Sequence, residues 1–299
     1  MDYKNIEYID NEVILEGVKN FNIKQILECG QCFRWDKISE MNYIIVAFGR
    51  VLEIKQEEDK VIFSNTNKID FEKIWLEYFD LGRDYDDIKE KLDIDETLKK
   101  SMEFGYGIRL LNQEAYEIVL SFIISARNSI PMIKKTILNI SEKWGNEIDY
   151  KGKKYYTFPT SEMLKGVTEE ELKAIGGSFR SKYIVDTVGK VNGDIANPSG
   201  EFNLERIIKL NDDECHKALQ EFKGIGAKVA DCIMLFGMGK HSAFPVDRWV
   251  ERIMNYFYKL DEKSLPKIRV IGRDKFGELA GFAQQYLFYY AITNNIKIK

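Results

Sequence analysis

Lys228 and Asp247 are the two residues whose types and surroundings could together do chemistry. Lys228 follows the segment Lys223-Gly-Ile-Gly, in which two glycines allow positive φ and a close approach of the backbone. It lies in the first turn of the helix that we expect to begin near Ala227. A cation there is unfavourably placed, and this placement with partial burial predicts a lowered pKa and a usable amine nucleophile. In isolation, a solvated phosphate-binding lysine is the more ordinary interpretation.

The glycine hairpin itself is suited to gripping the backbone of a nucleic acid. It presents free N–H groups at a helix N-terminus, where the positive end of the helix dipole favours a phosphate. Such a grip needs no large basic surface, so it is compatible with the net charge of −4. A Gly-x-Gly pattern alone would indicate only a turn between helices, and the neighbouring lysine and aspartate favour the functional interpretation.

Asp247 stands in the segment Ala243-Phe-Pro-Val-Asp-Arg-Trp249 and opens a helix expected over 248–258. An ordinary N-cap would be sufficient to explain it. A carboxylate held there should stay ionised and could stabilise a cation that develops beside Lys228. Cleavage of an N-glycosidic bond uses such a pair, because the carboxylate stabilises an oxocarbenium-like sugar while the amine captures C1′.

The elements that must position these residues fall into two groups. Short β-branched and aromatic runs with short connections predict antiparallel strands over 12–16, 31–35, 43–48, 51–54 and 61–63, with a hairpin turn at Phe48-Gly49. Spacings of three and four, with a capping box at Thr168–Glu171, predict helices from about residue 70 and over 112–126, 182–191, 214–222, 228–236, 248–258 and 277–293. The expected fold class is α+β, with an antiparallel β/α domain over 1–105 and a helical domain over 106–299.

Composition excludes several classes of protein. The 299 residues are 44% hydrophobic and 13% aromatic, which rules out a disordered chain. Four cysteines make no disulfide framework, and with only two histidines a zinc or redox site at Cys29-x-x-Cys32 is disfavoured. No apolar stretch is long enough to span a membrane, and the polar, acidic N-terminus is not that of a signal peptide. We therefore expect a cytoplasmic, nucleoid-associated protein.

At Lys228 and Asp247 the sequence resembles the helix–hairpin–helix DNA glycosylases, through GIGAKVADC at 224–232 and PVD at 245–247. The resemblance implies that Lys228 forms a Schiff base and that Asp247 assists it. It implies no organic cofactor. The hairpin residues that it assigns to DNA binding are Lys223, Gly224 and Gly226, and the backbone carbonyls that hold a cation in family members are those of Gln220, Phe222 and Ile225.

Within that superfamily the sequence is most similar to the 8-oxoguanine DNA glycosylase/AP lyases. GQCFRW at 30–35 and GFAQQYLF at 281–288 match that branch, and no Cys follows Cys232, unlike in the iron–sulfur branches. The implied substrate-binding residues are Gly30, whose carbonyl would accept from N7–H, Gln284 at the Watson–Crick edge, Phe288 and Cys232 on either face of the base, and Trp249 near a phosphate. Each has an ordinary alternative: Gln284 could face solvent, Phe288 could be core and Cys232 an apolar filler.

Excision from a duplex requires that the nucleotide is flipped out of the stack, and the resemblance implies which residues fill the gap. Arg127 and Asn128 align with a gap-filling loop, Phe179 with an aromatic wedge, and Arg180 with a contact to the orphaned base. Met132 stands where the family has a second arginine that reads cytosine. Strict selection of cytosine opposite the lesion is therefore not implied.

We predict a DNA-repair enzyme that is both a glycosylase, which is a hydrolase, and an AP lyase. It would act as a monomer on damaged double-stranded DNA, excise 8-oxoguanine through a lysine Schiff base and cut the strand by β-elimination. Two alternatives stay open. One is a glycosylase/lyase for other oxidised bases, and the other is a non-catalytic protein that binds DNA damage.

Overall fold

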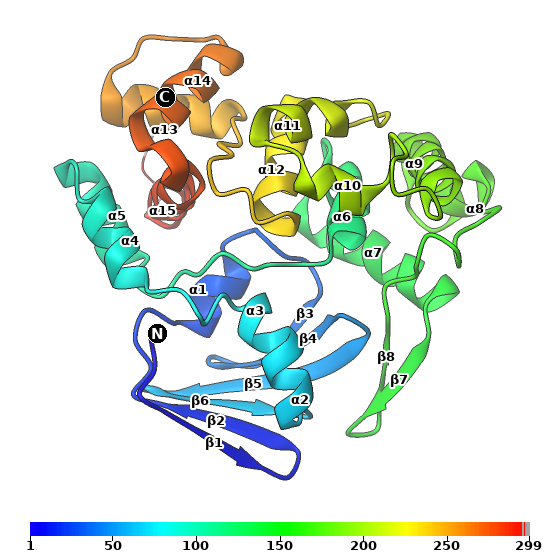
Figure 1. The fold of residues 1–299 in the computed structure, drawn as a ribbon, viewed down its shortest axis with the longest axis horizontal. Helices are drawn as coiled ribbons and strands as arrows, with labels where there is room; N and C mark the ends of the chain where they lie inside the picture. Colours follow the sequence, from blue (N-terminus) through cyan, green and yellow to red (C-terminus); the bar gives the residue numbers. More distant parts are fainter. Residues whose placement is uncertain (295, 297–299) are drawn as a thin grey trace.

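The computed structural model describes residues 1–294 and 296, and it is divided between a β-sheet at one end and helices at the other (Figure 1). The sheet has the strand order β1-β2-β6-β5-β4-β3, and every pairing is antiparallel. Its strands are β1 (Asn5–Ile9), β2 (Glu12–Glu16), β3 (Trp35–Ser39), β4 (Asn42–Ala47), β5 (Arg50–Glu57) and β6 (Lys60–Ser64). The predicted α+β class with an N-terminal antiparallel sheet is confirmed.

The turns of the sheet show why these residues fold as they do. Phe48 and Gly49 both have positive φ, 50° and 67°, and connect Ala47 and Arg50, which pair across the hairpin. Two such residues give the turn whose twist matches that of the strands. One helical run covers the sheet and buries Phe71 and Trp75 against its core; it consists of α2 (Lys68–Asp70), the π-helix η1 (Phe71–Trp75) and α3 (Leu76–Tyr78).

The strand predicted over 31–35 is wrong, because only Trp35 belongs to a strand. The segment before it follows α1 (Ile23–Glu28), which the sequence did not reveal. Gln31 is fully buried there; its Nε2 donates to the carbonyls of Ile26 and Arg109, and its Oε1 accepts from Leu111 N. These side-chain bonds replace a strand ladder and fix the backbone that leads to Gly30.

The helical part of the chain is built around α6 (Ala115–Ser125) and α12 (Ala227–Gly237), which pack side by side at its centre (Figure 1). Before α6 lie α4 (Tyr85–Leu92) and α5 (Glu96–Phe104), and after it α7 (Ile130–Trp144), the hairpin β7 (Glu147–Tyr150) and β8 (Lys153–Tyr156), α8 (Glu169–Ala174), η2 (Ser178–Arg180), α9 (Ser181–Asp194), α10 (Leu204–Lys209) and α11 (Asp212–Gln220). The chain then continues through α12 to α13 (Arg248–Tyr258), α14 (Leu265–Phe276), η3 (Gly277–Leu279) and α15 (Ala280–Thr293).

The helix predicted over 112–126 begins three residues later, at Ala115. The predicted capping box is present: Thr168 Oγ1 accepts from Glu171 N, and the Glu171 carboxylate accepts from Thr168 N. α4 and α5 pack against the helical core, while the strands have a core of their own. A third, small cluster in the described residues joins Ile44, Val46 and Val51 of the sheet to Tyr155 of β8. The expected boundary between 1–105 and 106–299 stays a prediction.

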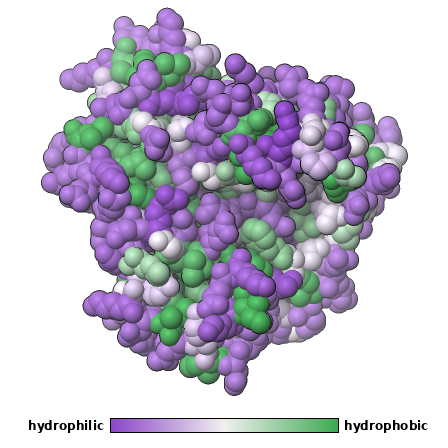
Figure 2. All heavy atoms as spheres, viewed as in Figure 1, coloured by the Kyte–Doolittle hydropathy of each residue, from purple (hydrophilic) through white to green (hydrophobic). Residues whose placement is uncertain are grey.

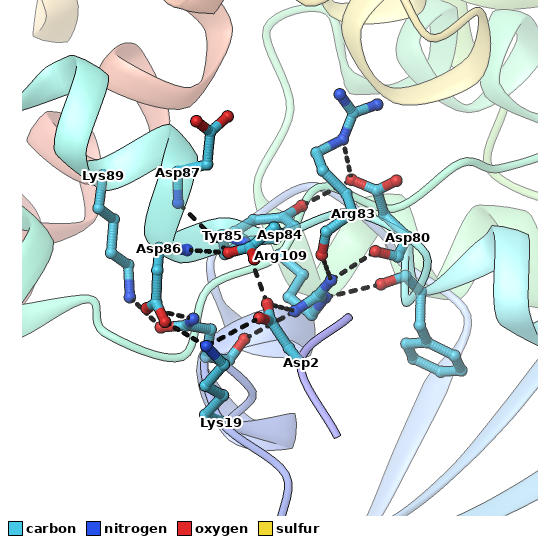
Figure 3. Close-up of polar contacts among 12 residues, drawn as sticks. Asp2, Lys19, Asp80, Arg83, Asp84, Tyr85, Asp86, Asp87, Lys89 and Arg109 are labelled. Carbon is cyan, nitrogen blue, oxygen red and sulfur yellow. Dashed lines mark hydrogen bonds and ion pairs between the residues drawn. The ribbon is translucent and has the colours of Figure 1, made fainter. Parts of the chain in front are cut away.

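Two arginines tie the parts of the molecule together: Arg109, which is buried, and Arg34, which is half-buried. Arg109 is fully buried, pairs with Asp2 at 2.8 Å and lies with its guanidinium carbon 3.9 Å from the centre of the Tyr85 ring, at the centre of the polar cluster in Figure 3. Arg34 pairs at 3.2 Å with Glu117 of α6 and donates to the Tyr156 carbonyl of β8. Each contact satisfies a charge that would otherwise be costly to bury.

Among the described residues, no helix is both long and apolar enough to cross a membrane. Hydrophilic residues cover most of the face in Figure 2, and hydrophobic residues are scattered between them. The surface therefore gives no sign of a single large apolar face in this view.

Candidate active site

The two candidate catalytic residues line one small cavity of about 60 Å³. Its walls come from the turn before β3 and from α6, α12, α13 and α15, which are brought together by the packing of the helical core. Six predicted site residues line it: Gly30, Lys228, Cys232, Asp247, Gln284 and Phe288. A cavity of this size holds a few water molecules, so a purine base could enter only if lining side chains moved.

Lys228 lies in the first turn of α12 with its side chain directed into the cavity, where its Nζ is 5.6 Å from the centre of the Phe122 ring. Its pKa is raised above the ordinary value by attraction to the Cys232 side chain and to Asp247, against the effect of burial. The predicted lowering of this pKa is therefore wrong. Burial also raises the pKa of the Cys232 thiol, and the neighbouring Lys228 side chain opposes that rise.

Asp247 is the N-cap of α13 and is half-buried. Its Oδ1 accepts hydrogen bonds from Trp249 N at 2.9 Å and Val250 N at 3.0 Å. Across the described residues, no ion pair within 4.0 Å joins this carboxylate to Lys228. The cap therefore holds a carboxylate at the rim of the cavity, and the space between the two charges is open to a ligand.

Gln284 projects from α15, which is otherwise mostly apolar, and is only 6% exposed. Among residues 1–294 and 296, its Oε1 finds no hydrogen-bond partner, which is uncommon for a buried polar atom. The orphan acceptor lies in the wall of the cavity, where it could accept from a donor on a bound base. The alternative that Gln284 faces solvent is excluded by its burial.

The position of Gly30 is fixed by a hydrogen bond between its neighbour Cys29 and a residue of α15. The neighbouring Gln285 donates from Nε2 to the Cys29 carbonyl at 2.9 Å, and Gly30 follows with φ of 90°. The sequence did not single out Phe122, Cys29 or Gln285 as cavity residues. A signal was present for Gln285, because two adjacent glutamines in an apolar helix must each find a buried partner or a ligand.

The hairpin connects α11 to α12 as predicted. Gly224 has φ of 87°, and a Cβ there would lie 2.6 Å from the ring of Tyr183, so both its conformation and its contact require glycine. Gly226 has φ of −98°, so of the two glycines only Gly224 uses a positive φ. A Cβ at Gly226 would meet nothing within 4 Å, which leaves open space beside the N-terminus of α12.

Lys223 is exposed on this hairpin and pairs with Asp186 of α9 at 3.0 Å. The predicted cation ligands are less clearly placed: the Phe222 carbonyl already accepts from Ile225 N at 3.2 Å within the turn. A cation on the carbonyls of Gln220, Phe222 and Ile225 stays a prediction.

The residues predicted to fill the gap in the DNA meet at the C-terminus of α6. Arg127 is exposed with φ of 50°, and Asn128 donates from Nδ2 to the Ile124 carbonyl at 3.1 Å. Arg180 is buried and donates to the carbonyls of Ala126 and Arg127 at 2.7 and 2.8 Å. In this structure Arg180 thus holds the loop that carries Arg127, and Phe179 next to it is 45% exposed.

Trp249 lies outside the wall of the cavity and is 51% exposed, with the guanidinium carbon of Arg252 5.7 Å from its ring. Cys29 and Cys32 are buried free thiols, and burial raises the pKa of Cys29 to about 12. Burial also raises the pKa of Cys32, so both thiols are in surroundings that disfavour the thiolate.

Comparison with known proteins adds family matches along the chain. Residues 13–119 match the N-terminal domain of 8-oxoguanine DNA glycosylase, and residues 120–271 match the HhH-GPD superfamily base excision DNA repair proteins. The probable N-glycosylase/DNA lyase of Methanothermobacter thermautotrophicus is 32% identical over 72% of this chain and 73% of its own. The N-glycosylase/DNA lyase OGG1 of Arabidopsis thaliana is 31% identical over 87% of this chain and 74% of its own.

A solved structure resembles the whole molecule. The 8-oxoguanine glycosylase/lyase of Clostridium acetobutylicum, in complex with double-stranded DNA containing cytosine opposite 8-oxoguanine, is 53% identical over 99% of this chain and 100% of its own, with a TM-score of 0.94. The chain is therefore a member of the HhH-GPD superfamily of base excision DNA repair proteins and, within it, of the 8-oxoguanine DNA glycosylase/lyase family.

Proposed function

We propose that the protein excises 8-oxoguanine from double-stranded DNA and then cuts the strand by β-elimination, with Lys228 as nucleophile and Asp247 as electrostatic partner. One observation carries the assignment of residues: an ammonium, a capped carboxylate and an orphan amide oxygen line the same cavity. The family gives the reaction class, and the cavity gives the groups that would perform it. We further propose that the protein acts as a monomer on nucleoid DNA.

In the proposed reaction the C1′–N9 bond of the flipped nucleotide breaks, and its electron pair leaves with the base. The Lys228 ammonium gives a proton to the departing base, and the resulting amine bonds to C1′ through its lone pair. Asp247 stays ionised and stabilises the positive charge that develops on the sugar. The C1′–O4′ bond then breaks, O4′ takes up a proton that the Lys228 nitrogen releases, and a protonated imine of C1′ and Lys228 forms. Loss of a C2′ proton to solvent then breaks the C3′–O bond and expels the 3′-phosphate.

Recognition of the base would come from groups on opposite sides of the cavity. The Gln284 Oε1 would accept from a donor on the Watson–Crick edge, and the Gly30 carbonyl from N7–H. Phe288 and the Cys232 side chain would contact the two faces of the ring. Guanine has no proton on N7, so the Gly30 contact would favour the oxidised base.

The flipped nucleotide would leave a gap that Arg127, Asn128 and Phe179 are proposed to fill. Met132 is 46% exposed near this loop and cannot donate hydrogen bonds to cytosine. We therefore expect weak selection of the opposite base, measurable as excision rates opposite each of the four bases. The backbone N–H groups at Gly224 and Gly226 would hold a phosphate.

Borohydride trapping tests the nucleophile. A duplex with 8-oxoguanine opposite cytosine should give a covalent adduct with the wild-type protein and none with Lys228→Gln, while Lys223→Gln on the nearby hairpin should still be trapped. Equal trapping by Lys228→Gln would reject the assigned residue. Adducts only with oxidised pyrimidines would favour the glycosylase/lyase for other bases, and tight binding with no adduct would favour a damage-binding protein.

A further inference from the structure

A second, larger cavity lies away from the active site, between the sheet and the helical part. It encloses about 320 Å³ and is walled by β3, β4, α7 and β8, which lie together in Figure 1. Its volume falls at the lower end of the range of about 300–1,000 Å³ for small-molecule sites. None of its lining residues belongs to the proposed catalytic cavity.

The wall of this cavity is predominantly cationic. Five of its lining side chains are lysine or arginine and two are acidic. Arg34, Lys153 and Lys154 are neutralised by Glu117, Asp36 and Glu147 respectively. In the described part of the chain, no carboxylate lies within 4.0 Å of Lys134 or Lys135, and the lining carboxylate of Glu142 is also in no ion pair, so the unpaired lining groups together carry one positive charge.

Lys134 is the more informative of the two because it is half-buried. Its Nζ donates to the Trp35 carbonyl at 2.8 Å and lies 3.4 Å from the centre of the Trp35 ring. An ammonium has three donors, so two remain. Burial lowers the pKa of Lys134, as expected of a cation that has lost water without gaining an anion.

Trp35 supplies a second unpaired donor. Its Nε1 is buried and donates to no partner in the part of the chain that the structure describes, although an indole N–H usually finds one. Trp35 is also the last residue of the GQCFRW segment, and nothing in the proposed glycosylase chemistry uses it. An orphan N–H beside an unpaired ammonium is an arrangement that suits the oxygen atoms of a phosphate.

The remaining walls indicate that the ligand is more than a bare phosphate. Val46, Ile137 and Leu138 give the cavity an apolar side, and Tyr155 and Tyr156 add aromatic surface. A phosphate of intact duplex DNA would be held at the surface by exposed cations such as Lys135, whereas Lys134 is half-buried and the Trp35 Nε1 is buried. The chemistry fits a planar aromatic group that carries one phosphate.

We propose that this cavity is a second ligand site that binds a nucleoside monophosphate, with Lys134 and Trp35 as donors to its phosphate. The site is independent of the proposed catalytic residues. Because α7 begins next to the loop at 125–129, a bound nucleotide would contact the helix that follows the proposed DNA-binding loop.

Equilibrium dialysis of the full chain against labelled GMP tests the site. One GMP should bind per chain, and Lys134→Met should weaken binding at least about tenfold, as expected from loss of a charged hydrogen bond. Lys143→Met is the matched control, since Lys143 lies on the same helix with its Nζ 4.5 Å from the ring of Trp144, outside the cavity. Binding by this variant should be unchanged.

Three results would overturn the proposal. GMP binding that is unaffected by Lys134→Met, or that an abasic-site duplex displaces competitively, would place the nucleotide elsewhere. Inorganic phosphate that binds as tightly as GMP would remove the nucleoside from the assignment. If Lys134→Met fails to fold, Trp35→Phe tests the same site, because it removes the indole N–H and should also weaken GMP binding; unchanged affinity would reject the site. Excision of 8-oxoguanine by the folded variants gives a separate readout of the proposed catalytic function.

Discussion

Lys228 illustrates how a site residue can be identified correctly for a physical reason that is partly wrong. The helix N-terminus and burial do disfavour its charge, but attraction to Cys232 and Asp247 raises the pKa of the amine. The residue is therefore an ammonium in the free protein. A proton on Lys228 is useful in the proposed reaction, because the departing base needs one and the amine becomes nucleophilic only after giving it up.

Asp247→Asn should slow excision strongly with little loss of stability. Asparagine is as good an N-cap as aspartate, so the bonds to Trp249 N and Val250 N can persist while the charge disappears. We expect single-turnover excision to fall roughly 100-fold or more, as for loss of other electrostatic stabilisers.

Asp247→Ala provides the comparison. It should lose the cap as well and cost about 1 kcal/mol in the free energy of unfolding. Excision by Asp247→Asn at the wild-type rate would remove the carboxylate from the mechanism.

Gln284→Leu should impair recognition of the base without lowering the stability of the protein. Removing an orphan buried acceptor should leave the melting temperature unchanged or slightly higher, whereas excision of 8-oxoguanine should fall about tenfold for loss of one hydrogen bond. Gln285→Leu is the matched variant, because it breaks the bond to the Cys29 carbonyl and should cost about 1 kcal/mol or more. A clear drop in melting temperature for Gln284→Leu would argue for a structural role instead.

At the scale of elements, the two hairpin glycines should respond differently. Gly224→Val forces a β-branched residue to φ of 87° and into the ring of Tyr183, so we expect loss of both stability and DNA affinity. Gly226→Val fits its φ, and its Cβ would meet no atom within 4 Å, so its melting temperature should match that of the wild type.

DNA affinity of Gly226→Val should nevertheless fall at least about tenfold if a phosphate must approach the N-terminus of α12. Thermal unfolding and a duplex-binding titration measure both effects. Wild-type affinity in this variant would show that no ligand comes close to Gly226.

Elements with a strong local signal were predictable from the sequence, and those fixed by distant partners were not. The helix over 248–258 matches α13 residue for residue because Pro245 and Asp247 mark its start. The segment 31–35 has the composition of a strand, yet Gln31 bonds to residues around position 110 and holds it irregular. The β7–β8 hairpin was only weakly predictable, from the dipeptide Lys151-Gly152 between tyrosine-rich runs. In the structure both residues of this turn have positive φ.

For the site, local motifs predicted which residues matter but not how the chain brings them together. Residues 30, 228, 247 and 284 share a cavity through contacts across the whole chain, which no spacing in the sequence reveals. The raised pKa of Lys228 likewise depends on neighbours that only the fold supplies.

At the scale of the whole molecule, Glu117 should make the free energy of unfolding depend on pH. It pairs with Arg34, which lies next to the sheet, and is itself part of the helical core's α6. Burial raises the pKa of this carboxyl from 4.5 to about 7, and Arg34 only partly opposes the rise. The folded protein then binds a proton more tightly than the unfolded chain. The free energy of unfolding should therefore decrease as pH rises from about 4.5 to 7, and this contribution should be constant above that range.

Glu117→Gln should remove this part of the pH dependence. Urea unfolding of both proteins at pH 5, 6, 7 and 8 measures it as the difference between their midpoints at each pH. We expect the variant to gain stability relative to the wild type as pH rises through the window. A difference that stays constant from pH 5 to 8 would contradict the raised pKa.

The hydrogen bond from Gln285 to the Cys29 carbonyl spans 256 positions of sequence. It ties α15 to the turn that carries Gly30, so the two sides of the cavity that are proposed to read a base depend on each other. A variant without α15 would keep Lys228 and Asp247 but would have neither Gln284 nor Phe288 to hold a base.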